Sequence, residues 1–202
     1  MPSIVDYPVV LDTLLGAGLE SLYHNSGAFG FPRAVPAHHV GWIGPADSTL
    51  KPSALPLTRR VPEPYARTLA MLAVRMWAGH LPGPVWLMPR NHWAFELDHG
   101  NSGWMPELLR GVGIDPAALS GRNDGAAIEF QVDEAETLVP ALEKLLTGLW
   151  GSDFALAWPG RPILCTVHHH TQLWWTTTDA NLLAALELLT RAAAAGDHDR
   201  LP

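Results

Sequence analysis

The segment from Ile163 to Thr177 constrains the fold more than any other part of the chain, because it reads as one long β-strand with three consecutive histidines at its middle. Successive side chains of a strand point to opposite faces of a sheet. One face is mainly apolar and consists of Ile163, Cys165, Val167, His169, Thr171, Leu173 and Trp175. The other face carries Leu164, Thr166, His168, His170, Gln172 and Trp174. We expect the first face to join a hydrophobic core.

The second face has the chemistry of a working surface. An unpaired polar group buried against helices costs about 1–3 kcal/mol. We therefore expect His168, His170, Gln172 and Trp174 to meet water, a metal, a ligand or a partner, and His92 to join this binding surface. The two imidazoles are predicted to open into a concave site, with His169 on the opposite side of the sheet.

A second short segment, His92–Asp98, alternates like a strand and places His92 and Glu96 on one face. If this strand neighbours the histidine strand, then His168, His170, His92 and Glu96 form a workable ligand set for Zn²⁺ or Fe²⁺. Glu96 would then be a ligand or a general base. The alternative is that the histidines are ordinary hydrogen-bonding residues of a half-exposed sheet face or of a turn.

The order of the predicted elements indicates an α+β fold. Residues 8–24 have a helical apolar period, and residues 25–62 are rich in Gly and Pro, with one short strand near Val40–Ile43. Strands are predicted at 85–88, 92–97, 126–132, 154–158 and 163–177, and helices at 64–79, 105–112, 134–149 and 180–195. We expect residues 63–202 to form a core with a single, mainly antiparallel sheet of about five strands. Residues 1–62 are expected to pack on that core as an N-terminal helix plus an irregular Gly/Pro-rich extension.

The predicted helix over residues 134–149 has the clearest amphipathic pattern. Its apolar residues recur at i, i+3, i+4 and i+7, and they are Leu138, Ala141, Leu142, Leu145 and Leu149. We expect this face to lie on the sheet, together with the helices at 64–79 and 180–195.

Composition excludes several classes of function. The formal net charge is −7 and no basic stripe is present, which argues against nucleic-acid binding. No apolar run approaches a membrane span, and no signal peptide opens the chain, so we expect a cytoplasmic protein. The preference for Arg over Lys, with much Ala, Gly and Pro, is typical of a GC-rich bacterial genome. Cys165 is the only cysteine and is expected to be a buried, inert thiol.

Two functions remain open from the sequence. Charged residues make up only 16% of the chain, which suggests apolar surface covered by a protein partner or a second copy in a homo-oligomer. The first function is therefore a small acidic binding module, of the accessory or immunity type, that uses a face lined by His and Trp; a small ligand is also compatible with it. The second is a small metal-dependent enzyme with His168 and His170 as ligands. We favour binding, because no known catalytic motif is present.

Overall fold

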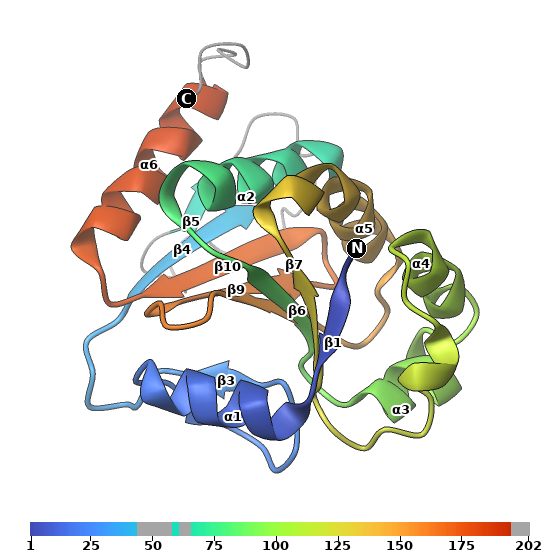
Figure 1. Ribbon diagram of the computed structural model, residues 1–202. Helices are drawn as coiled ribbons and strands as arrows, with labels where there is room; N and C mark the ends of the chain where they lie inside the picture. Colours follow the sequence, from blue (N-terminus) through green and yellow to red (C-terminus); the bar gives the residue numbers. More distant parts are fainter. Residues whose placement is uncertain (44–57, 61–65, 195–202) are drawn as a thin grey trace.

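A sheet of eight strands, in the order β1-β7-β6-β8-β9-β10-β4-β5, runs through the centre of the molecule (Figure 1). The computed structural model describes residues 1–43, 58–60 and 66–194, with side chains for residues 1–43 and 66–193. Neighbouring strands are antiparallel, except for the parallel pair β4 and β5. The strands are β1 (Ser3–Val5), β4 (His38–Ile43), β5 (Thr58–Arg60), β6 (Val85–Pro89), β7 (Ala127–Phe130), β8 (Phe154–Ala157), β9 (Ile163–His168) and β10 (Gln172–Thr177). The predicted α+β fold with a mainly antiparallel sheet is confirmed, and the sheet has more strands than expected.

Three long helices cover one face of the sheet, as predicted: α2 (Ala66–His80), α5 (Ala135–Gly148) and α6 (Ala180–Ala194) (Figure 1). Shorter helical segments connect β6 to β7 and β7 to α5. They are α3 (Trp93–Phe95), the π-helix η2 (Glu96–Gly100), α4 (Met105–Gly111) and the 3₁₀ turns η3 (Pro116–Ala118) and η4 (Val132–Glu134). None of the helices in the described part of the chain has the length and apolar character of a membrane span.

The main hydrophobic core lies between these helices and the sheet. Alternate residues of the central strands point into it, among them Leu87, Leu156, Cys165 and Trp175. The predicted face of α5 is confirmed, because its members are all buried: Leu138, Ala141, Leu142, Leu145 and Leu149. A helix whose apolar residues recur at this spacing can bury one stripe and leave the rest in water. The 3.6-residue period therefore fixes which side of α5 meets the sheet.

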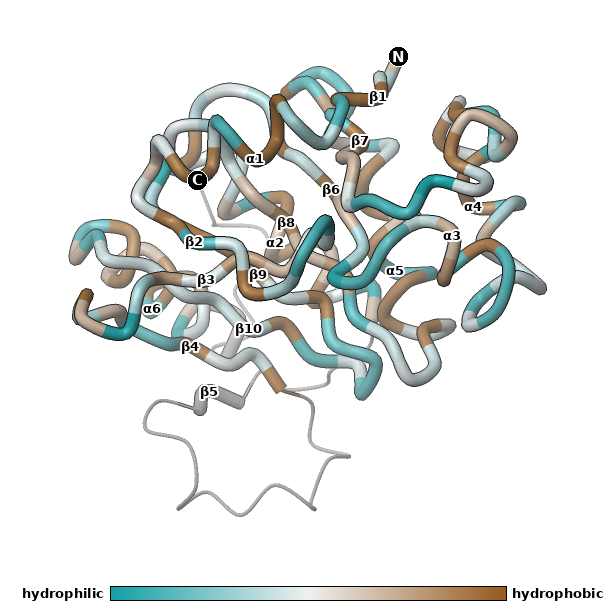
Figure 2. The backbone as a smooth tube through the Cα atoms, turned by 90° about the horizontal axis from the view of Figure 1, so that it is seen from below, coloured by the Kyte–Doolittle hydropathy of each residue, from teal (hydrophilic) through white to brown (hydrophobic). Residues whose placement is uncertain are grey.

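A smaller core lies on the opposite face of the sheet, under the N-terminal segment. Helix α1 (Tyr7–Gly16) and the two-stranded ribbon of β2 (Glu20–Ser21) and β3 (Phe29–Gly30) pack over β6 and β8 (Figures 1 and 2). The ribbon is fixed where Gly27 meets Gly125, since a Cβ on Gly125 would lie 2.1 Å from the backbone N of Gly27. The N–H of Gly125 also donates to the carbonyl of Asn25 at 2.8 Å. This close backbone approach holds the ribbon against the sheet.

The N-terminal region contributes more to the sheet than the sequence suggested. The predicted short strand near Val40–Ile43 is confirmed by β4, and β1 pairs with β7 at the far end of the sheet. The predicted helix over residues 8–24 ends at Gly16, as α1. The boundary proposed near residue 62 falls outside the described residues.

The prediction of one long strand over residues 163–177 is wrong. The segment forms two strands, β9 and β10, joined by a turn of His169, His170 and Thr171. Thr171 adopts φ of 57°, the left-handed conformation that ends a three-residue hairpin loop. The turn was missed because it contains no Gly, Asn or Pro. Gln172 pairs with His168 across the hairpin, so the predicted assignment of the strand residues to two faces still holds.

The prediction of a strand over His92–Asp98 is also wrong, because this segment is helical. His92 caps α3, and its Nδ1 accepts a hydrogen bond from the N–H of Phe95 at 3.2 Å. Trp93 and Leu97 are both buried in the main core. They are four residues apart and therefore share one helical face, although the same alternation of apolar residues also fits a strand.

Replacing Leu142 by Ala tests the packing of α5 on the sheet. Leu142 is 0% exposed, so we expect the free energy of unfolding to fall by about 2–5 kcal/mol in a denaturant titration. Leu188→Ala on α6 is the matched control, since that side chain is 48% exposed, and it should cost much less. Equal losses for the two variants would contradict this packing.

Candidate functional site

The face of the hairpin that points away from the helices is polar and only partly covered. On it lie Thr166 and His168 of β9, Trp174 and Thr176 of β10 and His39 of β4, and we call this set the open face. Each of these side chains is half-buried or exposed, whereas Val167, Leu173 and Trp175 on the other face are buried. Figure 2 views the backbone from this side of the sheet, with β9, β10 and β4 near the β2–β3 ribbon. The sequence correctly placed Thr166, His168 and Trp174 on this face, but Gln172, which was expected there to meet water or a ligand, is buried, with 1% exposed.

Trp174 is fixed in place on the open face. Its indole Nε1 donates to Oε1 of Gln172 at 2.8 Å, and its ring lies over Gly41 on β4. A Cβ on Gly41 would lie 2.4 Å from Cζ3 of Trp174. Trp175, the next residue, points into the main core, where it stacks on Trp158 with ring centroids 5.5 Å apart. The two neighbouring indoles therefore serve opposite faces, as the alternation predicted.

A pocket of about 380 Å³ adjoins the open face, between the sheet and the segment that follows the β2–β3 ribbon. Its cationic side chains are Arg33 and Arg90, and Thr166 and Thr176 bring hydroxyl groups to it. The remaining wall is mostly apolar and includes Phe29, Phe31, Val35 and Leu164. Neither His168 nor His170 lines this pocket, so the concave site lies farther along the face than the sequence predicted.

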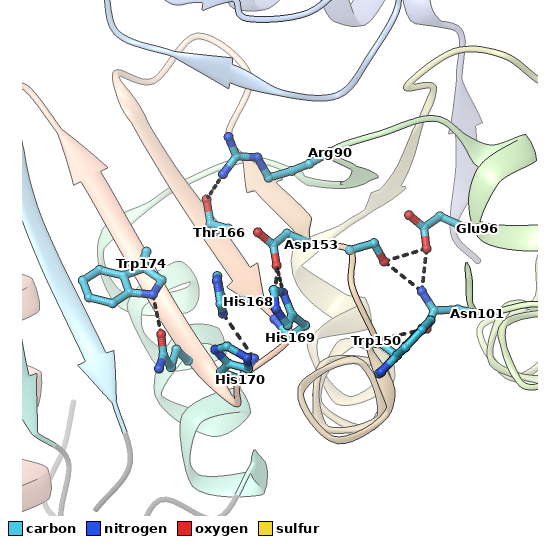
Figure 3. Close-up of polar contacts among 12 residues, drawn as sticks. Arg90, Glu96, Asn101, Trp150, Asp153, Thr166, His168, His169, His170 and Trp174 are labelled. Atoms are coloured by element: carbon cyan, nitrogen blue, oxygen red, sulfur yellow. Dashed lines mark hydrogen bonds and ion pairs between the residues drawn. The ribbon is translucent and has the colours of Figure 1, made fainter. Parts of the chain in front are cut away.

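The arginines of the pocket have no acidic partner among the described residues. Nη1 of Arg90 donates to Oγ1 of Thr166 at 3.3 Å (Figure 3). In the described part of the chain no carboxylate oxygen lies within 4 Å of the guanidinium of either Arg90 or Arg33. His39, at the rim, is within 3.2 Å of the Thr176 hydroxyl through its Nδ1. The pocket therefore concentrates positive charge on an acidic protein.

The three histidines converge at the end of the hairpin (Figure 3). His168, His169 and His170 each offer a ring nitrogen, and these atoms all lie within 4.8 Å of one another. His169 is held by Asp153, the residue just before β8, whose Oδ1 lies 2.8 Å from its Nδ1 and accepts from its backbone N–H at 3.1 Å. The prediction that His169 lies on the side opposite to His168 and His170 is therefore wrong.

The His168 ring is half-buried at the end of β9. Burial lowers the pKa of His168, and the nearby charges of His169, His170 and Arg90 act in the same direction, while Asp153 opposes them. Nδ1 of His168 accepts a hydrogen bond from the backbone N–H of His170 at 3.2 Å. A neutral ring with its proton on Nε2 satisfies this contact.

Glu96 and His92 lie apart from the histidine group. Glu96 is wholly buried in the π-helix η2, where its Oε2 accepts from Nδ2 of Asn101 at 2.6 Å and from Oγ of Ser152 at 2.9 Å. Its Oε1 has no hydrogen-bond partner in the described part of the chain. Burial raises the pKa of Glu96, against the two hydrogen bonds that lower it. A buried carboxyl with one unpaired oxygen is best accommodated in its neutral form.

The structure thus brings together only part of the predicted site. His168, His170, Gln172 and Trp174 belong to one hairpin, whereas neither His92 nor Glu96 belongs to the group of candidate metal ligands found in the described part of the chain. Sequence reasoning missed Asp153, Arg33 and Arg90, which come from other segments. Arg90 follows the buried strand β6 directly, but nothing local in the sequence indicates that it meets Thr166.

Comparison with protein-family models, with curated protein sequences and with solved structures gives no match for this chain. Its function therefore has to be argued from the chemistry of the site itself.

Replacing Gly41 by Ala tests the position of Trp174. The new Cβ would overlap the indole, so we expect a loss of about 1–3 kcal/mol in the free energy of unfolding. Gly79→Ala in α2 is the control, because no atom lies within 4 Å of a Cβ there. A Gly41→Ala variant as stable as the parent would show that Trp174 does not lie over Gly41.

Replacing Glu96 by Gln tests the neutral state of the buried carboxyl. The folded-state pKa is raised, so the stability that Glu96 contributes is present at low pH and is lost as the pH rises through the folded-state pKa. Gln cannot ionise, so the melting temperature of Glu96→Gln relative to the parent should rise between about pH 4 and pH 8. The exposed Glu107→Gln is the control. A difference that stays constant with pH would contradict a raised pKa.

Proposed function

We propose that the protein is a binding module whose open face and adjoining pocket take up a small ligand with an anionic group. The observation that supports this most is the pair of guanidiniums, Arg33 and Arg90, that line one pocket without a carboxylate partner in the described part of the chain. Arginine is the side chain best suited to carboxylate and phosphate groups, because its planar fork donates two parallel hydrogen bonds.

The negative net charge of the chain makes this local pair of cations distinctive. The chain carries a formal net charge of −7, so a general attraction for anions is absent. A local pair of cations on such a surface confines the favourable potential to the pocket. The hydroxyls of Thr166 and Thr176 lie in the same lining and add donors for anionic oxygens.

The rest of the lining indicates the kind of molecule that carries the anionic group. Phe29, Phe31 and Leu164 offer apolar contact in the same pocket. The volume of about 380 Å³ is within the range of small-molecule sites, which is roughly 300–1,000 Å³. We propose an aromatic or branched aliphatic carboxylate or phosphate as the ligand class.

Binding is favoured over catalysis by the chemistry of this lining. Within the described part of the chain the pocket lining contains no carboxylate, thiol or lysine, and its one imidazole is that of His39. General acid–base catalysis and covalent catalysis both need such groups within hydrogen-bond reach of the substrate. The protein partner or homo-oligomer expected from composition is a separate proposal, compatible with this one.

The test uses benzoate and phenyl phosphate as anionic probes and benzamide as their neutral counterpart, followed by NMR titration of the full chain. We expect the two anions to shift resonances of the pocket and to bind more tightly than benzamide. Arg33→Gln and Arg90→Gln should each weaken anion binding about tenfold or more, since a hydrogen bond to a charged group contributes about 1.5–3 kcal/mol.

Arg191→Gln is the matched control, because it removes the same charge from α6 on the helix-covered side of the sheet. It should leave binding of both anions unchanged. Equal weakening by all three substitutions would indicate a general effect of net charge and would contradict a pocket-specific site. Binding of benzamide as tight as that of benzoate would contradict the role given to the arginines.

A further inference from the structure

The turn between β9 and β10 has a second chemistry that the anion pocket does not use. Three imidazoles stand on three consecutive residues, and their rings pack together with centroids 4.2 Å apart for His168 and His169, 4.3 Å for His169 and His170 and 5.0 Å for His168 and His170. Their ligand atoms lie within 4.8 Å of one another. Nitrogen atoms bound to one Zn²⁺ at about 2.0–2.1 Å are closer together than this, so modest side-chain rotations would complete the group.

Asp153 prepares His169 for metal binding. Its Oδ1 lies 2.8 Å from Nδ1 of His169, and a carboxylate in this place requires the proton on Nδ1. Nε2 then carries the free lone pair and is the ligand atom. A histidine held by a carboxylate through its other ring nitrogen is the usual arrangement at zinc sites, where it fixes the tautomer and raises ligand basicity.

His170 and His168 complete the group in different ways. The His170 ring is exposed and contacts the other two rings. The His168 ring has its Nδ1 against the backbone N–H of His170 at 3.2 Å, and this bond lies at the long end of the usual range. A metal would displace it at small cost.

We propose that the β9–β10 turn binds one Zn²⁺ ion through His168, His169 and His170, with Asp153 supporting His169 from behind. Three neutral nitrogen donors favour zinc, whereas non-haem iron sites combine two histidines with a ligating carboxylate. Three protein ligands would leave a fourth coordination position for water or an anionic ligand. This replaces the ligand set expected from the sequence, because His92 and Glu96 take no part. The proposal does not depend on the anion pocket.

The test is calorimetric titration of the tag-free full chain with zinc chloride. We expect one site per chain in the parent, and its loss in the triple variant His168→Ala, His169→Ala, His170→Ala. Asp153→Asn keeps an acceptor for His169 but removes the charge, so affinity should fall about 10–100-fold. His38→Ala, His39→Ala is the matched control, since it removes another pair of adjacent exposed histidines, on β4, and should leave the affinity unchanged.

Imidazole nitrogen NMR of the zinc-loaded parent needs no variant, so its result cannot arise from a variant that fails to fold. We expect metal-induced shifts at Nε2 of His169, with its Nδ1 still protonated. Thermal melts without zinc show which variants fold. If variants of His169 do not fold, His170→Ala still tests the site, because its side chain is exposed. The proposal is overturned if the parent and the triple variant titrate alike, if the His38/His39 control loses as much affinity, or if the affinity is unchanged by both Asp153→Asn and His170→Ala.

Discussion

Asp153, the residue just before β8, connects the two candidate sites. Its Oδ1 accepts from the backbone and the ring of His169, and its carbonyl accepts the N–H of Arg90 at 2.9 Å. The same short segment holds the buried network, since Ser152 donates to Glu96. One end of β8 thus positions a cation of the pocket, an imidazole of the turn and a buried carboxyl. Because these contacts come from two adjacent residues just before β8, the relative placement of Arg90, His169 and Glu96 depends on this one short segment.

The two faces of the sheet have different environments, although the same strands contribute side chains to both. The helix-covered side holds Trp42, Trp158 and Trp175 in edge-on and stacked contacts, with no charge nearby in the hairpin itself. The open side holds hydroxyls, imidazoles and the flat indole of Trp174. Polar groups on that side meet water or one another, so their desolvation does not burden the core. A site built this way can change its polar residues with little effect on stability.

Period and length in the sequence were enough for the helices and for most of the strands. The apolar stripe of α5 follows from side-chain direction alone, and that prediction was confirmed. The two faces of the hairpin follow in the same way for the strand residues, but not for His169, which lies in the turn. The turn at Thr171 was not predictable from composition, because a threonine takes the left-handed conformation only when its surroundings hold it there; its Oγ1 donates to the carbonyl of Leu146 at 3.0 Å. The segment His92–Asp98 was ambiguous, because the spacing of Trp93 and Leu97 fits both a helix and a strand. Arg90, Arg33 and Asp153 were missed since their roles arise from pairing between distant segments.

The three-residue length of the turn has a consequence for how such a chain varies. Gln172 lies opposite His168 because a three-residue loop with a left-handed residue at its end returns the chain in this register. A shift of that register by one residue would turn Trp174 toward the core and Trp175 toward water. Insertions and deletions in this turn are therefore tolerated only where another loop type restores the pairing of His168 with Gln172.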